Sequence, residues 1–307
     1  MITVISAQEI AQAQLPLRDV YDLVLEGFRL HARGEYEMPS KLGVHTRPGA
    51  LMHAMPVYLP SEQLAGTKLV SVYPRNPERG MAALSGVIAM FDPETGEHSE
   101  VIDAAWITNT RTAMVSMVDV AYLAVPNPVF GVIGATGASG RAHLDAIAEI
   151  FPGSQVLLNS RSRERCEVLQ REFADQALNL RVEMNLEQLV RTCDVVIVVT
   201  SHLQDPILDP AWLRPGQNVL NVHTRAWPAA ALDVIDVVSC DDRRQLLSSP
   251  ETFELFPGLD PDLELGTVVD GQHPGRTSPH ATYFSLNYGL AIFDVLVADA
   301  IRKRVVT

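Results

Sequence analysis

Three glycines, Gly134, Gly137 and Gly140, stand in the stretch GVIGATGASGR, between an apolar run and a segment of helical pattern. Glycine lets backbone N–H groups approach a pyrophosphate without a Cβ in the way, and the N-terminus of a following helix adds partial positive charge. The usual dinucleotide spacing is G-x-G-x-x-G, whereas the first gap here is longer by one residue. The stretch therefore predicts either a phosphate-binding loop or a tight turn in an α/β protein that binds no nucleotide.

The end of the next apolar run, VLLNSRSRER, is a second candidate for contacts with a cofactor. Asn159 stands where an NAD-specific site has Asp or Glu, and Ser160, Arg161 and Arg163 follow it. A hydroxyl and a guanidinium can hold a 2′-phosphate by charge-assisted hydrogen bonds, each contributing roughly 1.5–3 kcal/mol. We therefore expect NADP(H) in preference to NAD(H). The other interpretation is a solvated, charged start of a helix.

Two basic residues of the first third could bind an anion. Lys68, in a predicted strand, shares one face with Val70 and Val72, so it could hold a carboxylate or work with a lowered pKa. Its alternative is a lysine that extends along apolar surface to reach water. Arg111 falls early in a helix predicted to begin at Thr108 as N-cap. A cation is unfavourable there, so an anionic ligand would explain it; an exposed arginine is the alternative.

The predicted elements divide the chain into two patterns. A helix over 8–33 and short strands over 44–102 predict a first region of α+β type. From VPNPVFGVIG onward, apolar runs alternate with helical stretches such as 140–150 and 162–175, which predicts a Rossmann-type doubly wound parallel sheet. The final stretch, YGLAIFDVLVADAIRK, predicts an amphipathic helix.

Composition excludes several classes of function. The chain has 307 residues, 47% of them hydrophobic, and a formal charge of −13, which argues against a nucleic-acid or anionic-membrane surface. Its three cysteines are far apart and form no C-x-x-C, so we expect neither disulfides nor a metal site. No signal peptide or membrane-spanning run is evident, and we expect a cytoplasmic protein.

The motifs taken together resemble the ornithine cyclodeaminase/mu-crystallin family over nearly the whole chain. The matching stretches, in order, are MPSKLGVH, HAMPVYLP, GTKLVSVYPRNPERG, FDPETGE, ITNTRTAMVS, the glycine loop, CDVVIVVTS, WLRPGQNV, ELGTVVDG and GRTSP. The resemblance implies a homodimer with a discontinuous substrate-binding and dimerisation domain over 1–118 and 280–307. It implies a dinucleotide-binding Rossmann domain over 119–279.

The resemblance also implies roles for individual residues. Lys68 and Arg111 match the residues that hold the substrate carboxylate beside the nicotinamide, so Arg111 also lies against the cofactor, and Lys68 serves as the catalytic proton carrier. Lys41 falls where many members have Arg in the same clamp, and it keeps the charge without the bidentate geometry. The cofactor-binding positions outside the clamp are then Gly134, Thr136, Gly137, Ala138, Ser139, Gly140, Asn159, Ser160, Arg161, Arg163, Thr200 and Ser201.

The chain departs from the family at NVHTRAWP. Cyclodeaminases that turn ornithine into proline have a glycine and, two residues later, an Asp; here His223 replaces the glycine and Arg225 the Asp. Arginine cannot act as a general base and would repel a cationic side chain. His223 is a candidate contact to the substrate. The alternative is a histidine that only makes local hydrogen bonds at the end of its strand.

We therefore expect an NAD(P)H-dependent enzyme acting at the Cα–N bond of a small amino or imino acid, as an imine (ketimine) reductase or an amino-acid dehydrogenase. One alternative is an ornithine cyclodeaminase that forms proline and ammonia with bound NAD. A second is a mu-crystallin-like protein that binds NADPH with little turnover. The intact basic clamp favours an enzyme over the binding protein.

Overall fold

The computed structural model describes residues 2–47, 49–200, 203–222 and 225–305, and it divides into two compact units. Unit 1 comprises Met1–Thr112 with Gly289–Thr307, and unit 2 comprises Ala113–Tyr288. The chain passes from unit 1 to unit 2 within α3 (Ala105–Leu123), and returns to unit 1 at Gly289.

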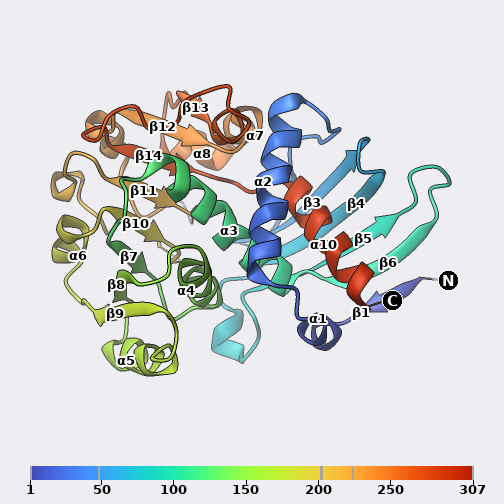
Figure 1. The fold of residues 1–307 in the computed structure, drawn as a ribbon, viewed down its shortest axis with the longest axis horizontal. Helices are drawn as coiled ribbons and strands as arrows, with labels where there is room; N and C mark the ends of the chain where they lie inside the picture. The colour runs from blue at the N-terminus through green and yellow to red at the C-terminus, as the bar shows by residue number, and fades with distance from the viewer. Residues whose placement is uncertain (1, 48, 201–202, 223–224, 306–307) are drawn as a thin grey trace. The chain divides into compact units, whose positions relative to one another are not determined.

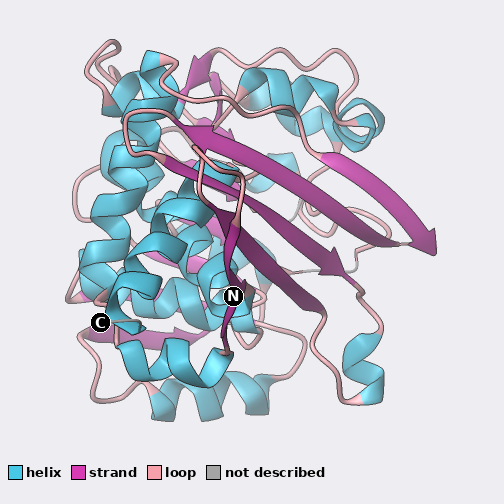
Figure 2. Cartoon of the chain, turned by 90° about the vertical axis from the view of Figure 1, so that its right-hand side faces the viewer, coloured by secondary structure: helices cyan, strands magenta, loops and turns pink. Residues whose placement is uncertain are grey.

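Unit 1 is built on a six-stranded sheet with the order β1-β6-β5-β4-β3-β2. β1 runs parallel to β6 and the other neighbours are antiparallel, and Figure 2 shows the twist of the long strands. The strands are β1 (Thr3–Ile5), β2 (Leu42–Arg47), β3 (Ala50–Leu59), β4 (Leu64–Val72), β5 (Leu84–Phe91) and β6 (His98–Asp103). A short 3-10 turn, η1 (Asn76–Arg79), lies between β4 and β5.

Two helices replace the single helix predicted over residues 8–33. α1 (Ala7–Ala13) starts in a capping box formed by Ser6 and Glu9, and α2 covers Leu17–Arg33. The chain breaks between them because Gln14 is left-handed (φ 46°) and Pro16, which has no N–H, stands directly before α2.

The last helix, α10 (Ala291–Val305), is buried rather than amphipathic, so that prediction is wrong. Every residue from Ala291 to Asp299 is buried, because α10 packs against α2 on one side and against β3 and β4 on another (Figure 1). Basic residues gather only in its last turn. A helix covered on several sides is apolar around most of its circumference.

α3 begins three residues before the predicted N-cap. The Asp103 carboxylate accepts a hydrogen bond from the backbone N–H of Ala105 at 2.9 Å, and it thereby satisfies a free donor at the helix start. Thr108 is already inside the helix, and its hydroxyl is buried without a hydrogen-bond partner among the described residues. Arg111 therefore lies in the second turn, and the prediction of Thr108 as N-cap is wrong.

Unit 2 contains an eight-stranded, wholly parallel sheet with the order β13-β12-β14-β11-β10-β7-β8-β9. The strands are β7 (Phe130–Ile133), β8 (Ser154–Asn159), β9 (Leu178–Val182), β10 (Val195–Val198), β11 (Asn218–Asn221), β12 (Val237–Cys240), β13 (Leu263–Glu264) and β14 (Tyr283–Leu286). The predicted fold class, a Rossmann-type sheet together with an α+β unit, is confirmed. The prediction did not include β9, β13 or β14.

The helices of unit 2 are short and connect the parallel strands. They are α4 (Ala138–Ile150), α5 (Arg163–Glu172), α6 (Leu186–Thr192), α7 (Arg243–Ser248), α8 (Pro250–Leu255) and α9 (Leu265–Val269), with 3-10 turns η2 (Pro210–Trp212) and η3 (Ala229–Val234). No helix within the described ranges of either unit is long and apolar enough to span a membrane.

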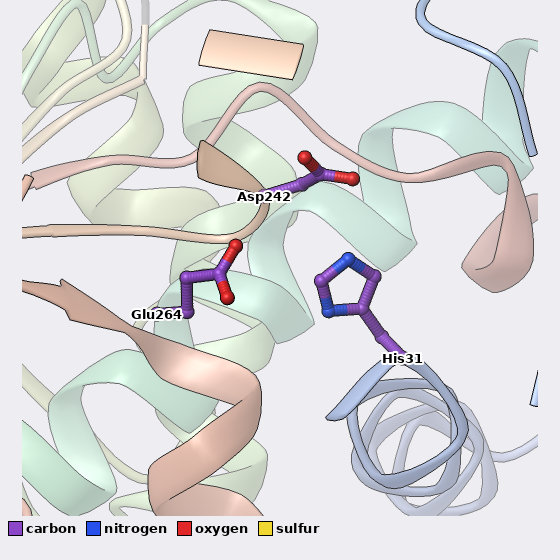
Figure 3. A group of neighbouring side chains, drawn as sticks. All are labelled: His31, Asp242 and Glu264. Atoms are coloured by element: carbon purple, nitrogen blue, oxygen red, sulfur yellow. The ribbon is translucent and has the colours of Figure 1, made fainter. Parts of the chain in front are cut away.

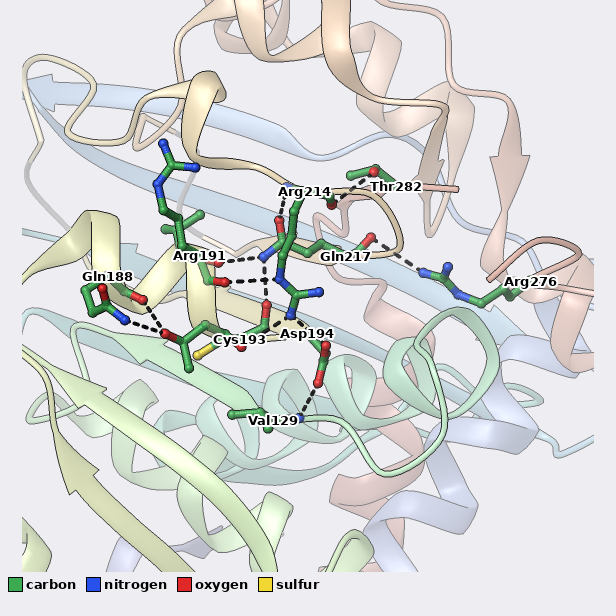
Figure 4. A network of polar contacts seen from close by, with 11 residues as sticks. Val129, Gln188, Arg191, Cys193, Asp194, Arg214, Gln217, Arg276 and Thr282 are labelled. Atoms are coloured by element: carbon green, nitrogen blue, oxygen red, sulfur yellow. Dashed lines mark hydrogen bonds and ion pairs between the residues drawn. The ribbon is translucent and has the colours of Figure 1, made fainter. Parts of the chain in front are cut away.

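A polar network holds together the segments that lead into β10 and β11 (Figure 4). The side chain of Gln217 donates to the carbonyl oxygens of Val190 and Cys193 at 2.6 and 2.7 Å, and it accepts from the Arg214 N–H at 2.7 Å. Arg214 also pairs with Asp194 at 2.7 Å. This network lies at the amino ends of the strands, which leaves the carboxyl ends, where ligands bind in such sheets, to the loops.

The three cysteines are buried in unit 2 and form no disulfide. Burial raises the pKa of the Cys193 thiol to about 12, and it also raises the pKa of Cys166 and Cys240. Because the thiolate is the reactive form, these side chains are packing residues.

Candidate functional site

Lys68, Arg111 and Asp294 form a buried cluster of charges in unit 1. The Lys68 Nζ lies 2.6 Å from one carboxylate oxygen of Asp294, and the Arg111 Nε lies 2.8 Å from the other. The side chains are 1%, 6% and 0% exposed, respectively. Strand β4 supplies the lysine, α3 the arginine and α10 the aspartate, so three segments far apart in the sequence bring one anion between two cations.

The cluster changes the acidity of its members. Burial, together with the charge of Arg111, lowers the pKa of Lys68 to about 7, although the ion pair with Asp294 works in the opposite direction. Burial alone would raise the pKa of Asp294, but Arg111 and Lys68 hold it below its usual value. The carboxylate therefore stays charged, and the lysine can give up or accept a proton near neutral pH.

Gly289 fixes the position of the Arg111 guanidinium. This glycine has a left-handed backbone (φ 80°), and a Cβ built on it would collide with the terminal nitrogens and Cζ of Arg111. The terminal nitrogens of Arg111 have no hydrogen-bond partner among the described residues, since only Nε is used by Asp294. They are the donors that could bind a planar carboxylate in bidentate fashion.

Lys41 lies immediately before β2 in unit 1, and its charge reaches the cluster. It lowers the pKa of Lys68 and also that of His53 on β3, for which burial is the larger cause. The structure therefore brings the predicted residues Lys41, Lys68 and Arg111 into one electrostatic environment.

Asp294 was missed by the sequence analysis. The signal that could have found it is a single acid among apolar residues in GLAIFDVLVA, because a charge is not buried in such a helix without a partner. His53 was also missed. Its position two residues before Met55, which pairs with Lys68 across β3 and β4, is visible only once the strand register is known.

The glycine loop follows β7 in unit 2 and leads into α4. Gly134 has a left-handed backbone (φ 90°), and a Cβ on it would stand 2.7 Å from the backbone nitrogen of Thr200. A Cβ on Gly140 would collide with the backbone of Ala135. Gly137 is the N-cap of α4 and brings no side-chain hydrogen bond, so the first N–H groups of this helix are left for another acceptor. These features fit the pyrophosphate of a dinucleotide.

The end of β8 lies beside this loop. The Asn159 carbonyl accepts from the N–H groups of Gly134 and Ala135, while its side-chain amide donates to the Glu183 carbonyl at 2.8 Å. The hydroxyls of Thr136 and Ser160 are 2.8 Å apart. The side chain of Asn159 is therefore used within the fold, and the loop is tied to the strand that carries the candidate ribose contacts.

Arg161 and Arg163 are exposed beyond β8. Arg163 lies 3.9 Å from Glu167, which is one turn further along α5. Arg161 has no ion-pair partner among the described residues, so its guanidinium is the more accessible of the two. Ala138 and Ser139 occupy the first positions of α4, between Gly137 and Gly140.

Arg225 pairs with two acids of α8. It lies 3.4 Å from Glu251 and 3.3 Å from Glu254, so its charge is compensated within unit 2. The other two candidates from the neighbouring segments, His223 and Ser201, lie outside the described residues.

Asp242 and Glu264 form an acidic pair in unit 2, and both carboxylates bind backbone N–H groups (Figure 3). Their carboxylate oxygens lie within 4.8 Å of one another. Asp242 accepts from the Gln245 N–H at 2.8 Å and Glu264 from the Arg243 N–H at 2.7 Å, so both carboxylates cap the N-terminus of α7. His31, also drawn in Figure 3, belongs to α2 of unit 1, where its ring stacks on Tyr36.

The fold defines a Rossmann-type protein with a second, α+β unit. The chain belongs to the ornithine cyclodeaminase/mu-crystallin family, whose model matches residues 2–307. It is 32% identical over 302 residues to the nodulation efficiency protein NfeD of Rhizobium meliloti, covering 97% of this chain and 93% of that one. It is 28% identical over 311 residues to an alanine dehydrogenase of Archaeoglobus fulgidus, covering 98% and 94%.

A solved structure shows the same fold. The Δ1-pyrroline-2-carboxylate reductase of Thermococcus litoralis, determined in complex with NADH and L-proline, superposes with a TM-score of 0.88 at 21% identity. The match covers 99% of this chain and 98% of that one. Both units of the present chain therefore have counterparts in that protein.

Proposed function

We propose that the protein is an NAD(P)H-dependent reductase or dehydrogenase that acts at the Cα–N bond of a small amino or imino acid. The observation that carries this proposal is the buried cluster of Lys68, Arg111 and Asp294, which combines a carboxylate-binding guanidinium with a lysine whose pKa is about 7. The relatives named alanine dehydrogenase and pyrroline-2-carboxylate reductase support it, because both names describe chemistry at such a bond.

Each member of the cluster has a separate task. Arg111 binds the substrate carboxylate through its terminal nitrogens, with Lys41 adding positive charge. Lys68 supplies the proton that the substrate nitrogen gains when the C=N bond becomes a C–N single bond, and it accepts that proton in the opposite direction. Asp294 holds both cations in place. When bound, a reduced nicotinamide dinucleotide would supply the hydride that the carbon gains and would be oxidised by giving it up.

Unit 2 is the proposed cofactor-binding part of the chain. Gly134, Gly137 and Gly140 leave room for a pyrophosphate, and Ser160 and Arg161 are the candidate contacts to a 2′-phosphate. We therefore propose NADP(H) as the preferred cofactor. Measured KM values for NADPH and NADH test this, and a clear preference for NADH contradicts it. Arg161→Ala is expected to raise the KM for NADPH more than that for NADH.

A homodimer is proposed on the face of the unit 1 sheet opposite to Lys68. Cross-strand pairing places apolar side chains on this one face, and they are exposed. They are Val4, Leu42, Val44, Met52, Leu69 and Val87. An apolar patch of this kind is typical of an interface. Sedimentation equilibrium tests the proposal: a dimer is expected for the native chain, and a dissociated form for Val44→Lys.

Ornithine cyclodeamination is disfavoured. Arg225 stands where cyclodeaminases of the family have an Asp, and its pairing with Glu251 and Glu254 stabilises its positive charge at that position. A cationic group cannot take a proton from the substrate amino group. Glu251 and Glu254 are engaged with Arg225, and we assign the role of the cyclodeaminase Asp to no described residue.

The experiment that tests the proposed function is a screen of NADPH oxidation with cyclic ketimines, and with oxo-acids plus ammonia or methylamine. Turnover is expected with members of at least one class and is lost in Lys68→Ala, which keeps its affinity for the cofactor. Reaction with ornithine alone, without net use of NADPH, would favour a cyclodeaminase. Tight binding of NADPH without turnover would favour a binding protein of mu-crystallin type.

A further inference from the structure

His53 lies beside Lys68 on the same face of the unit 1 sheet. In the register of β3 and β4, Met55 is opposite Lys68 and His53 is opposite Val70, so the histidine is the diagonal neighbour of the lysine. Diagonal neighbours on one face are about 7–8 Å apart, which is within reach of a short carbon chain. On this face α10 contacts β4 at two positions: Asp294 pairs with Lys68, and Val295 lies against Gly66. Gly66 lies on the other side of Lys68 from His53.

The imidazole of His53 is held over a glycine. Gly43 on β2 is opposite His53, and a Cβ on Gly43 would stand 2.9 and 3.0 Å from ring atoms Cδ2 and Nε2. The ring is half-buried, and neither of its nitrogens has a hydrogen-bond partner among the described residues. A half-buried ring with unused nitrogens is suited to bind a polar group that comes from elsewhere.

Within the described part of the chain, the charged groups that act on His53 are all basic. They are Lys41 before β2, His45 on β2 and Lys68 on β4, with Asp294 of α10 already shared between Lys68 and Arg111. Burial and these charges together lower the pKa of His53 to about 4, so the free ring is neutral at pH 7 and offers one N–H donor. An anion brought into this environment would be attracted by the basic groups. It would also raise the pKa of His53, so that the ring gains a proton.

We propose that His53 determines substrate specificity and selects amino or imino acids whose side chain ends in a second carboxylate. This inference rests on the proposed function, since it takes the first carboxylate to be bound by Arg111 and Lys68. The substrate side chain then extends from the Lys68 position toward β3, and its terminal carboxylate accepts a hydrogen bond from the His53 ring. Gly43 leaves the space in which the ring adopts this orientation.

Steady-state kinetics tests the selection. For the native enzyme, kcat/KM is expected to be higher with an oxo- or imino-dicarboxylic acid than with the matching monocarboxylic acid that ends in a methyl group. His53→Leu should reduce this ratio about ten-fold or more, because it removes a hydrogen bond to a charged group. Gly43→Ala, which pushes the ring aside, should reduce it in the same direction. His98→Leu, at an exposed histidine of β6, is the matched control and should leave the ratio unchanged.

Calorimetry of dicarboxylate binding, in two buffers of different ionisation enthalpy, gives a readout that does not depend on turnover. Proton uptake at pH 7 is expected for the native protein with cofactor, and a smaller uptake is expected in His53→Leu, in which only Lys68 still gains protons. A native preference for the monocarboxylic acid, or an unchanged ratio in a folded His53→Leu, overturns the inference while the proposed function stands. Absence of turnover with every imino or oxo acid overturns the proposed function, and the difference in proton uptake between the native protein and His53→Leu then still decides whether His53 binds a carboxylate.

Discussion

Lys68 and Asp294 form an ion pair that is closed to solvent, with 2.6 Å between Nζ and Oδ2 and side chains only 1% and 0% exposed. The second carboxylate oxygen is bound by Arg111. One buried anion therefore serves two buried cations, and an anionic substrate would complete the balance of charge.

Asp294→Asn should destabilise unit 1 strongly, because it keeps the shape of the side chain and leaves Lys68 and Arg111 buried without a counter-charge. Removing one partner of a buried pair costs about 3–5 kcal/mol. Denaturant unfolding measures this loss. Asp22→Asn is the matched control, since its partner Arg18 lies 3.7 Å away on an exposed face of α2 and the change should alter stability little. Equal effects of the two substitutions would contradict the assigned role of Asp294.

The rate of reduction should depend on the protonation of Lys68. With a pKa of about 7, the lysine is charged below pH 7, so kcat/KM for imine reduction should be level there and fall about ten-fold per pH unit above it. In the direction of amine oxidation the lysine must be neutral, so kcat/KM should rise up to about pH 7 and then level off. Full pH profiles in both directions check the sign. A reduction rate that is constant from pH 6 to 9 would remove Lys68 as the proton carrier.

Gly289→Ala should weaken substrate binding, because its Cβ would displace the Arg111 guanidinium. We expect KM to rise about ten-fold and stability to fall by about 1–3 kcal/mol, the latter from strain in the left-handed backbone. Gly96→Ala is the matched control: Gly96 has a similar φ of 73° but no atom near its Cβ position. The difference in KM between the two variants isolates the steric effect on Arg111. If both change KM alike, Gly289 does not position the arginine.

Gly134→Ala should impair binding of the dinucleotide, because the new Cβ would meet the backbone of Thr200 and deform the loop. Fluorescence titration with NADPH should give a Kd raised about five-fold or more, as expected for about 1–3 kcal/mol of strain. Gly153→Ala is the matched control, because Gly153 has a φ of 82° and open space around its Cβ position. It measures the effect of backbone strain alone, without a steric change in the glycine loop. An unaltered Kd in Gly134→Ala would exclude this loop from the cofactor site.

The parallel sheet was largely predictable, because strands such as VVIV of β10 read as continuous apolar runs followed by helical patterns. The strands that were missed show the limit of such patterns. β13 has two residues, and β14 stands close before an apolar helix, so a short apolar run could not be separated from the helix by periodicity. The start of α3 was misplaced because Asp103 and Thr108 are both good N-caps, and only the backbone geometry selects one.

The candidate site was predictable in part. Lys68 and Arg111 were found from local position and family motifs, but Asp294 was not, because its partners are distant in sequence: 183 positions separate it from Arg111. Tertiary packing makes a buried acid in α10 favourable, and no local propensity encodes that. His53 depends in the same way on the register of β3 with β2 and β4.

The order of segments along the chain affects how the protein can be synthesised. α10, which carries Asp294, follows the whole of unit 2 in the sequence. The ribosome therefore synthesises every strand of the parallel sheet before α10, the helix whose Asp294 pairs with Lys68 and Arg111. β14, which lies between β12 and β11 in that sheet, directly precedes α10, so unit 2 also needs the last part of the chain before its sheet is complete. The N-terminal unit, although made first, is completed last, and until then its sheet exposes the face that α10 will cover.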